Sequence, residues 1–311
     1  MTAEAVTSPS SPVLPPESAG SPLPGVAGPS LSPSRAADFK TCPLLFRFRT
    51  IDRLPEQPTR DQVRGTLVHA VLERLFDLPA ADRTPEAAAS LVAPQWERLA
   101  AEEPALSVLF EAGAATEEVV SLETFLTSAT GLLDGYFAVE DPRRLEPAER
   151  ETLVSTLVND ELLIRGYIDR LDVSPAGDLR VVDYKTGGAP REAFEGRALF
   201  QLKFYALVLW RTRGVVPRVL RLLYLKDAEV LDYSPESDEL ERFERTLVAL
   251  SQAIERAKQD KDFRPKPSRL CGWCSHKEFC PEFGGTIPPY PDRPVTALPL
   301  TAIPVTSAVD D

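Results

Sequence analysis

Two aspartates and one lysine lie close together in a segment that reads as a β-hairpin. Asp169 belongs to residues 166–173 (GYIDRLDV), and Asp183 and Lys185 belong to residues 179–187 (LRVVDYKTG). Isoleucine, valine and leucine are frequent in both segments, and the SPAGD sequence between them is a strong turn signal. We therefore expect two central antiparallel strands that carry these three ionisable side chains.

The register of this hairpin decides whether the two carboxylates meet. A turn centred on the alanine of SPAGD places Asp169 opposite Asp183, and it also places Asp172 opposite Arg180 as a favourable cross-strand ion pair. A slip of one residue would turn every side chain to the other face. Because side chains alternate along a strand, Lys185 shares the face of the two aspartates in this register.

Carboxylates placed side by side among apolar residues repel each other and are poorly solvated unless a cation lies between them. Their oxygens are hard ligands that suit Mg²⁺ or Mn²⁺. A lysine just beyond the second carboxylate can hold a metal-bound water or stabilise negative charge on a phosphate. The spacing also fits a strand-end salt bridge, in which Lys185 pairs with Asp183 and Asp169 faces solvent. Spacing alone leaves both interpretations open.

His69 is one of two histidines and lies in residues 64–73 (RGTLVHAVLE). Apolar residues recur with a helical period over residues 64–76 and predict a helix there. A neutral imidazole can bind a metal, but a hydrogen-bonded structural histidine is the simpler interpretation of this residue alone. The H-E-x-x-H pattern of zinc proteases does not occur in the sequence.

The four cysteines are distributed unevenly along the chain. Cys271, Cys274 and Cys280 form a compact group, and Cys42 lies far earlier in the sequence. Four thiolates suit Zn²⁺ or an iron–sulfur cluster, and a site that joins both ends of a domain would hold it closed. We interpret His276, which lies inside the cysteine segment, as a surface residue rather than a ligand.

Secondary-structure signals around these residues alternate between helix and strand. We expect acidic, mainly helical structure over 85–140, strands over 152–158, 161–173 and 179–185, a helix over 198–213, a second hairpin over 218–233, and a long helix over 237–258. Helices before and after a central sheet indicate an α/β domain.

Composition limits the class of protein. The chain has 311 residues, of which 26% are charged, and a formal net charge of −12, which argues against a uniformly basic surface for nucleic acid. Apolar runs are far shorter than the ~20 residues of a membrane helix, so we expect no membrane partner. Residues 1–34 contain no lysine or arginine, so we expect neither a signal nor a transit peptide, and a cytoplasmic protein.

Proline-rich sequence marks both ends of the chain. Of the 30 prolines, 8 lie in residues 1–33 and 6 in residues 284–311. Neither segment offers a periodic apolar face, so we expect two disordered tails. The folded part is then expected over residues 34–283.

Several of these segments occur in the same order in one family. The chain resembles the RecB-type exonucleases of the PD-(D/E)XK nuclease superfamily, in the iron–sulfur branch that includes AddB-like and CRISPR-associated RecB-like nucleases. The matching segments, which span nearly all of residues 34–283, are SRAADFKTCP, RGTLVHAVLE, GYIDRLD, VVDYKTG and QLKFY.

The resemblance implies a restriction-endonuclease-like α/β core, with a central mixed sheet flanked by helices. It also implies a helical insertion at about residues 77–148, and a lobe built from residues 34–60 and 261–283 that is clipped by a cluster. We call these two stretches the cysteine lobe. By the resemblance, the lobe holds a [4Fe–4S] cluster, with zinc as the less expected occupant, on four ligands: Cys42, Cys271, Cys274 and Cys280.

The resemblance also implies roles at the matching positions of the core. Mg²⁺ or Mn²⁺ would be bound by His69, Asp169, Asp183 and the carbonyl group of Tyr184. Lys185 would be the catalytic lysine. The Q-x-x-x-Y element, Gln201 and Tyr205, would help to position the DNA strand and the site, whereas without the resemblance both would be read as ordinary helix residues packed on the sheet.

The stretches that form the cysteine lobe are locally basic, because residues 34–60 and 261–280 each carry a net charge of +3. Interleaved aromatic residues would let this lobe bind a single strand, although they could equally form a small core.

We therefore expect a metal-dependent DNA nuclease, an exonuclease on single-stranded DNA or DNA ends in repair or recombination. The alternatives are a non-catalytic iron–sulfur DNA-binding subunit of a repair or CRISPR adaptation complex, and a zinc-stabilised interaction protein. No G-x-x-x-x-G-K-[ST] motif occurs, so a helicase partner would be a separate chain.

Overall fold

A mixed β-sheet forms the centre of the fold in the computed structural model, which describes residues 28–110, 120–189 and 195–291. Its strands are β1 (Ser30–Leu31), β2 (Glu149–Val158), β3 (Leu162–Val173), β4 (Leu179–Lys185), β5 (Val219–Tyr224) and β6 (Glu229–Tyr233). The strand order is β1-β3-β4-β5-β6, with β2 also paired to β3. The β1–β3 and β4–β5 pairs are parallel and the others are antiparallel. The expected α/β fold with a mixed sheet is confirmed.

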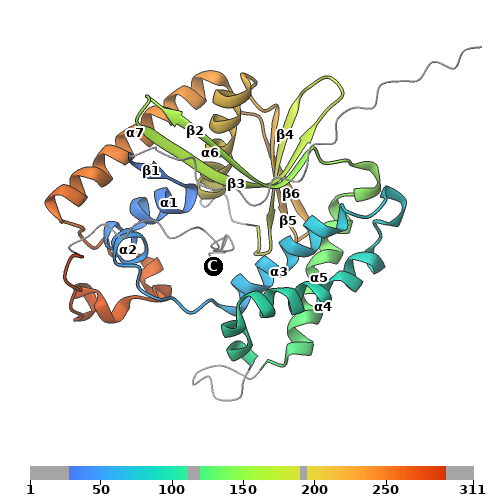
Figure 1. Ribbon diagram of the computed structural model, residues 1–311, viewed down its shortest axis with the longest axis horizontal. Coiled ribbons are helices and arrows are strands. Elements are labelled where there is room, and N and C mark those ends of the chain that lie inside the picture. Colours follow the sequence, from blue (N-terminus) through green and yellow to red (C-terminus); the bar gives the residue numbers. More distant parts are fainter. Residues whose placement is uncertain (1–27, 111–119, 190–194, 292–311) are drawn as a thin grey trace, which may run out of the picture.

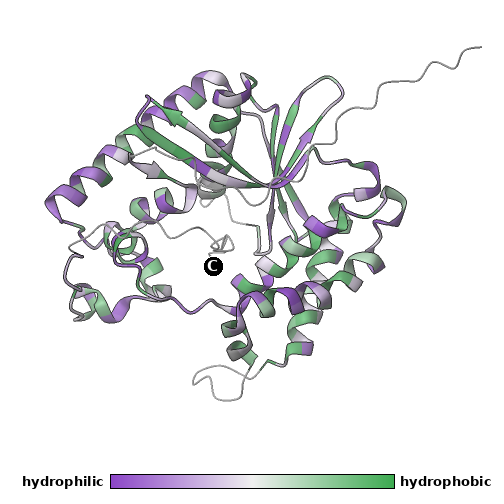
Figure 2. Cartoon of the chain, in the orientation of Figure 1, coloured by the Kyte–Doolittle hydropathy of each residue, from purple (hydrophilic) through white to green (hydrophobic). Residues whose placement is uncertain are grey.

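Helices cover both faces of this sheet (Figure 1). They are α1 (Pro33–Thr41), α2 (Pro43–Phe46), α3 (Arg60–Leu75), α4 (Pro85–Glu102), α5 (Leu122–Val139), α6 (Glu195–Arg213) and α7 (Ser237–Asp260). Buried residues of α3, α4 and α5 form one hydrophobic cluster with β4 and β5, and those of α2, α6 and α7 form another with β3 and β4. The long α7 carries hydrophilic and hydrophobic residues along its whole length, as a helix that covers a core should (Figure 2).

Local chemistry explains where the site-bearing elements begin. The helix predicted from residue 64 begins four residues earlier, at Arg60, because Thr59 and Gln62 form a capping box at its N-terminus. The β3–β4 hairpin has the expected register, with Asp172 paired to Arg180 and Leu171 paired to Val181. These two elements bring the predicted histidine and carboxylates to one end of the sheet.

Two short segments that we expected in the tails belong to the fold. Ser30 and Leu31 form β1, and Leu31 is fully buried. Near the other end, the Tyr290 ring stacks on Phe263, and Arg47 donates a hydrogen bond of 2.5 Å to the Pro288 carbonyl oxygen. Such segments are too short for a periodic apolar pattern, so their partners, not their own sequence, order them. The rest of the expected tails, residues 1–27 and 292–311, lies outside the described residues.

Within the described residues, no helix is both long enough and apolar enough to cross a membrane.

Candidate active site

Three acidic residues lie in a row across β2, β3 and β4. Arg150 of β2 pairs with Arg170 of β3, so the next residues, Glu151 and Asp169, lie opposite each other. The pairing of β3 with β4 ends at Arg170 and Val182, and the next residues on the two strands are Asp169 and Asp183. Asp169 and Asp183 keep only 6% and 1% of their surface exposed, so both carboxylates are withdrawn from water.

Both β2 and β3 are irregular at this row. Ile164, Ile168 and Leu171 all pack into the same hydrophobic cluster, although regular alternation would place Ile168 and Leu171 on opposite faces. The phase of β3 therefore changes at Asp169. On β2, Glu151 has a φ of 44°, and it is the only non-glycine residue of the described strands with a positive φ. Irregularities of this kind re-aim side chains beside functional sites.

His69 reaches the row from α3. A Cβ atom on Gly65 would lie 3.1 Å from Thr186 Oγ1, so the glycine allows α3 to approach the end of β4 closely. One turn later, His69 Nε2 lies 3.0 Å from the Tyr184 carbonyl oxygen. A proton on Nε2 would satisfy this carbonyl and leave Nδ1, which lies 3.6 Å from Asp169 Oδ2, free to bind a metal.

The row has the donor set of a divalent cation site. His69, Glu151 and Asp169 each offer one ligand atom, and these atoms lie within 4.8 Å of one another. Asp183 Oδ2 lies 2.7 Å from Lys185 Nζ, whereas Asp183 Oδ1 is buried and has no hydrogen-bond partner among the described residues. Buried carboxylates without donors are stable only when a cation compensates them. The residues present therefore fit Mg²⁺ or Mn²⁺.

One alternative from the sequence is partly wrong. Lys185 does pair with Asp183, as a strand-end salt bridge requires. However, Asp169 does not face solvent, because it is buried and accepts a 2.8 Å hydrogen bond from the Tyr184 amide.

The packed charges shift the pKa values of the metal-binding candidates. Burial favours a neutral His69, but the carboxylates of Asp169, Glu151 and Asp183 outweigh it and raise the pKa of His69 to about 9. Burial, together with the charges of Asp183 and Glu151, raises the pKa of Asp169 to about 8 against the opposing effect of His69. Both shifts favour protons on this coupled pair before a cation binds.

These raised pKa values predict that metal binding releases protons. Because Mn²⁺ must displace the protons of Asp169 and His69, we expect its affinity to increase as the pH rises from about 7 to about 9, on the order of tenfold per pH unit for each proton released. Calorimetric titration with Mn²⁺, in buffers of different ionisation enthalpy, measures both the affinity and the number of protons. An affinity that is constant over this range would contradict the raised values.

Lys185 is held by two residues of α6. Its Nζ donates a 2.9 Å hydrogen bond to Gln201 Oε1, and Gln201 Nε2 donates a 3.0 Å hydrogen bond to the hydroxyl of Tyr205. Burial and the nearby carboxylates raise the pKa of Tyr205 well above its usual value, so its hydroxyl stays protonated. A Cβ atom on Gly166 would lie 2.7 Å from the Tyr205 ring, so the glycine of GYIDRLD makes room for this tyrosine.

Sequence reasoning missed Glu151. We expected the strand to begin at residue 152, and Glu151 stands in the charged run ERE, where nothing marks one glutamate as different from another. Only the pairing of β2 with β3 brings it to the row, and that pairing is a property of the fold.

The structure brings together the two ends of the chain that carry the cysteines, and Figure 1 shows α1 and α2 beside the C-terminal segment. Lys266 and Ser268 donate backbone N–H hydrogen bonds to the sulfur atoms of Cys42 and Cys271. Burial raises the pKa of the Cys274 thiol, which interacts electrostatically with both of those cysteines. All four cysteines are half-buried and none forms a disulfide. N–H donors beside thiolates are usual around iron–sulfur clusters.

The interpretation of His276 as a surface residue is wrong. Its exposed fraction is 1%, its Nε2 lies 2.6 Å from Glu56 Oε1, and its ring packs against Phe48. The partner Glu56 lies far away in the sequence, so the cysteine segment alone could not show that this histidine belongs to the small core of the lobe.

Two arginines of the cysteine lobe pair with acidic residues of the same lobe, which leaves the net charge of +3 on residues 34–60 and on residues 261–280 unchanged. Arg47 pairs with Asp52, and Arg49 pairs with Asp38 and Glu56. The buried rings of the lobe, Phe46, Phe48 and Phe263, form its core. Trp273 differs, since 71% of its surface is exposed. The aromatic part of the expected DNA-binding surface is therefore smaller than the sequence indicates, because three of these rings are buried.

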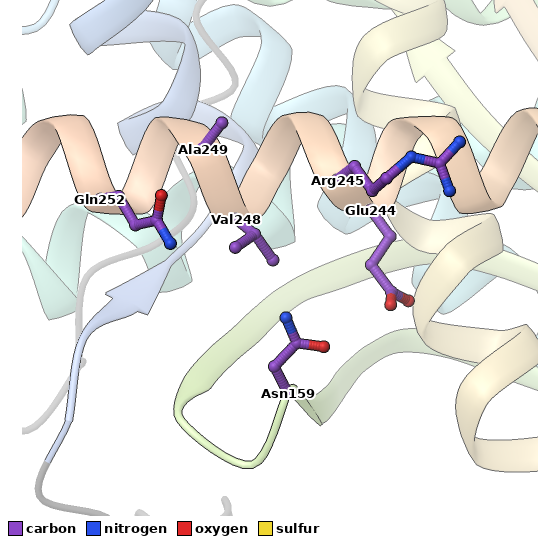
Figure 3. Close-up of a pocket in the computed structure, with 6 residues that line it drawn as sticks. All are labelled: Asn159, Glu244, Arg245, Val248, Ala249 and Gln252. Atoms are coloured by element: carbon purple, nitrogen blue, oxygen red, sulfur yellow. The ribbon is translucent and has the colours of Figure 1, made fainter.

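A surface hollow between α7 and the β2–β3 turn lies apart from the carboxylate row (Figure 3). It is lined by Asn159, Glu244, Arg245, Val248, Ala249 and Gln252. None of the site residues expected from the sequence belongs to this lining.

The chain belongs to the PD-(D/E)XK nuclease superfamily, whose sequence model matches residues 30–281. Among characterised sequences it is similar to the Gene 69 protein of Mycobacterium phage D29, with 28% identity over 214 residues, which is 60% of this chain and 71% of the relative. The Gene 69 protein of Mycobacterium phage L5 is 30% identical over 127 residues, which is 40% of this chain and 41% of the relative. A crystal structure of a provisionally named exonuclease from Eubacterium rectale superposes with a TM-score of 0.49 and 9% identity, covering 79% of this chain and 87% of the other.

Proposed function

We propose that the protein is a metal-dependent DNA nuclease, an exonuclease that acts on single-stranded DNA or DNA ends in repair or recombination. The observation that carries this proposal is the buried row of carboxylates with a lysine ammonium 2.7 Å from Asp183. In the PD-(D/E)XK superfamily, to which the chain belongs, DNA is the natural substrate class.

In this proposal, His69, Asp169 and Asp183 would hold Mg²⁺ or Mn²⁺, which would supply Lewis-acid chemistry for the activation of water and the polarisation of the scissile phosphate. Asp183 and Gln201 hold the Lys185 ammonium at the edge of the row, where it donates hydrogen bonds to the nucleophile or to a phosphate oxygen. The Tyr184 carbonyl, which we expected as a metal ligand, accepts a hydrogen bond from His69 and can orient its ring.

We further propose that Cys42, Cys271, Cys274 and Cys280 bind a [4Fe–4S] cluster with a structural role, with zinc as the alternative occupant. The backbone N–H donors at Cys42 and Cys271 support a thiolate-bound group at this place. The exposed Trp273 beside the cluster ligands offers a stacking surface for a base of a single strand. A helicase or other repair subunit would supply that strand from a separate chain.

The activity test is digestion of single- and double-stranded DNA, labelled at either end, by anaerobically purified protein with Mg²⁺ or Mn²⁺. We expect products released progressively from an end and no cleavage when the metal is chelated. DNA binding without cleavage under all these conditions would favour the non-catalytic iron–sulfur subunit instead.

Hydrogen bonds link Lys185 to Gln201 and Gln201 to Tyr205. They predict that a substitution of Gln201 lowers the cleavage rate and leaves the bound metal in place. We expect Gln201→Ala to lower the single-turnover cleavage rate by about 10- to 100-fold, because Lys185 loses one of its two partners. The affinity for Mn²⁺ should be unchanged, since Gln201 is not a ligand. Tyr205→Phe, which removes only the hydroxyl at the end of the chain, is the milder comparison. Equal rates for Gln201→Ala and the wild type would contradict a role in holding the lysine.

A further inference from the structure

Glu151 has no role in the proposed nuclease site as derived from the sequence. We propose that Glu151 is a further ligand of the divalent cation and supplies a carboxylate from β2. This inference rests on the proposed metal site of His69, Asp169 and Asp183. It adds to that site one negatively charged ligand, which comes from a further strand, β2.

Distances support direct ligation. Glu151 Oε1 lies 3.5 Å from His69 Nδ1, which is as close as Asp169 Oδ2 at 3.6 Å. The ligand atoms of Glu151, His69 and Asp169 lie within 4.8 Å of one another. Two ligands of one Mg²⁺ at about 2.1 Å are at most about 4.2 Å apart, so a side-chain shift of a few tenths of an ångström is enough for one cation to bind all three. Asp183, by contrast, is drawn toward Lys185.

The backbone of Glu151 supports a functional role for its side chain. A φ of 44° is unfavourable for a residue with a Cβ atom. A glycine or asparagine would adopt this conformation more easily. The strain is retained at the one point of β2 that lies opposite Asp169, where it directs a carboxylate to the row.

A third carboxylate also suits the charge balance of the site. The ionised Asp169, Asp183 and Glu151 carry a charge of about −3, and Lys185 contributes about +1. With a neutral His69, one divalent cation brings this buried group to zero, which is the favourable state in a medium of low dielectric.

The test measures Mn²⁺ alone, without DNA, bound to the full chain and to Glu151→Gln, a substitution of equal size. Titration gives the affinity, and pulsed electron paramagnetic resonance in isotopically labelled water counts the water molecules on the metal. Glu161→Gln, which changes an exposed glutamate at the end of the same hairpin, is the matched control. Circular dichroism without metal checks that each variant is folded.

We expect Glu151→Gln to weaken Mn²⁺ binding by about 10- to 100-fold and to add one metal-bound water, while Glu161→Gln changes neither. An unchanged affinity together with an unchanged water count would overturn ligation by Glu151 and leave the proposed nuclease site intact. Failure of the wild type to bind Mn²⁺ would instead refute the proposed metal site itself.

Discussion

Replacement of Asp183 by asparagine is expected to abolish DNA cleavage, with a loss on the order of 1,000-fold or more, equivalent to about 4 kcal/mol of transition-state stabilisation. This carboxylate has two tasks, because it faces the proposed cation and holds the Lys185 ammonium at 2.7 Å. Asparagine has nearly the same shape but carries no charge. We therefore expect Asp183→Asn to keep its fold and to lose both Mn²⁺ affinity and cleavage.

Lys185→Ala separates the two tasks. It should lose cleavage to a similar extent and still bind Mn²⁺, because the lysine is not a ligand. Two conservative surface changes serve as controls: Asp160→Asn at the exposed tip of the β2–β3 hairpin, where asparagine tolerates the φ of 58°, and Lys258→Ala on α7, whose ion pair with Glu255 is exposed. Undiminished cleavage by both active-site variants would refute the assignment of the site.

Loss of one cysteine is the second change with a large expected effect. Cys42→Ser should remove the cluster and destabilise the lobe by several kcal/mol, because the proposed cluster ties residues 34–60 to residues 261–283. The wild type should be brown and contain about four iron atoms and about four sulfides per chain. Iron and sulfide analysis, visible absorbance and thermal unfolding of the wild type and variant measure this effect.

Cys274→Ser is the matched variant from the other end of the chain. It should give the same loss of iron and the same fall in unfolding temperature as Cys42→Ser, since all four thiolates would share the proposed cluster. Two results would contradict the cluster: zinc in place of iron in the wild type, or full iron content after Cys42→Ser.

The local part of the site could be predicted from the sequence. The hairpin register follows from a five-residue turn and one cross-strand ion pair, Asp172 with Arg180, and both are encoded within twenty residues or so. The placement of His69 on a helix follows in the same way from a local apolar period. Patterns of this kind involve only residues that are close in the sequence, so a single sequence is enough to predict them.

Contacts between distant segments could not be predicted in this way. Glu151 joins the row only through the β2–β3 pairing, and His276 is buried only because Glu56 and Phe48 surround it. Leu31 is ordered by its parallel pairing with β3. In each case the decisive partner is set by tertiary packing, to which a single sequence gives no direct access.

The most direct test of the central claim compares the cleavage of end-labelled single-stranded DNA by the wild type, Asp183→Asn and Asp160→Asn at a Mn²⁺ concentration that saturates the wild type. A nuclease centred on the carboxylate row predicts that the wild type and Asp160→Asn release nucleotides at equal rates, whereas Asp183→Asn is inactive. Cleavage by Asp183→Asn at the wild-type rate would contradict the claim, and so would a wild type that binds this DNA without cutting it.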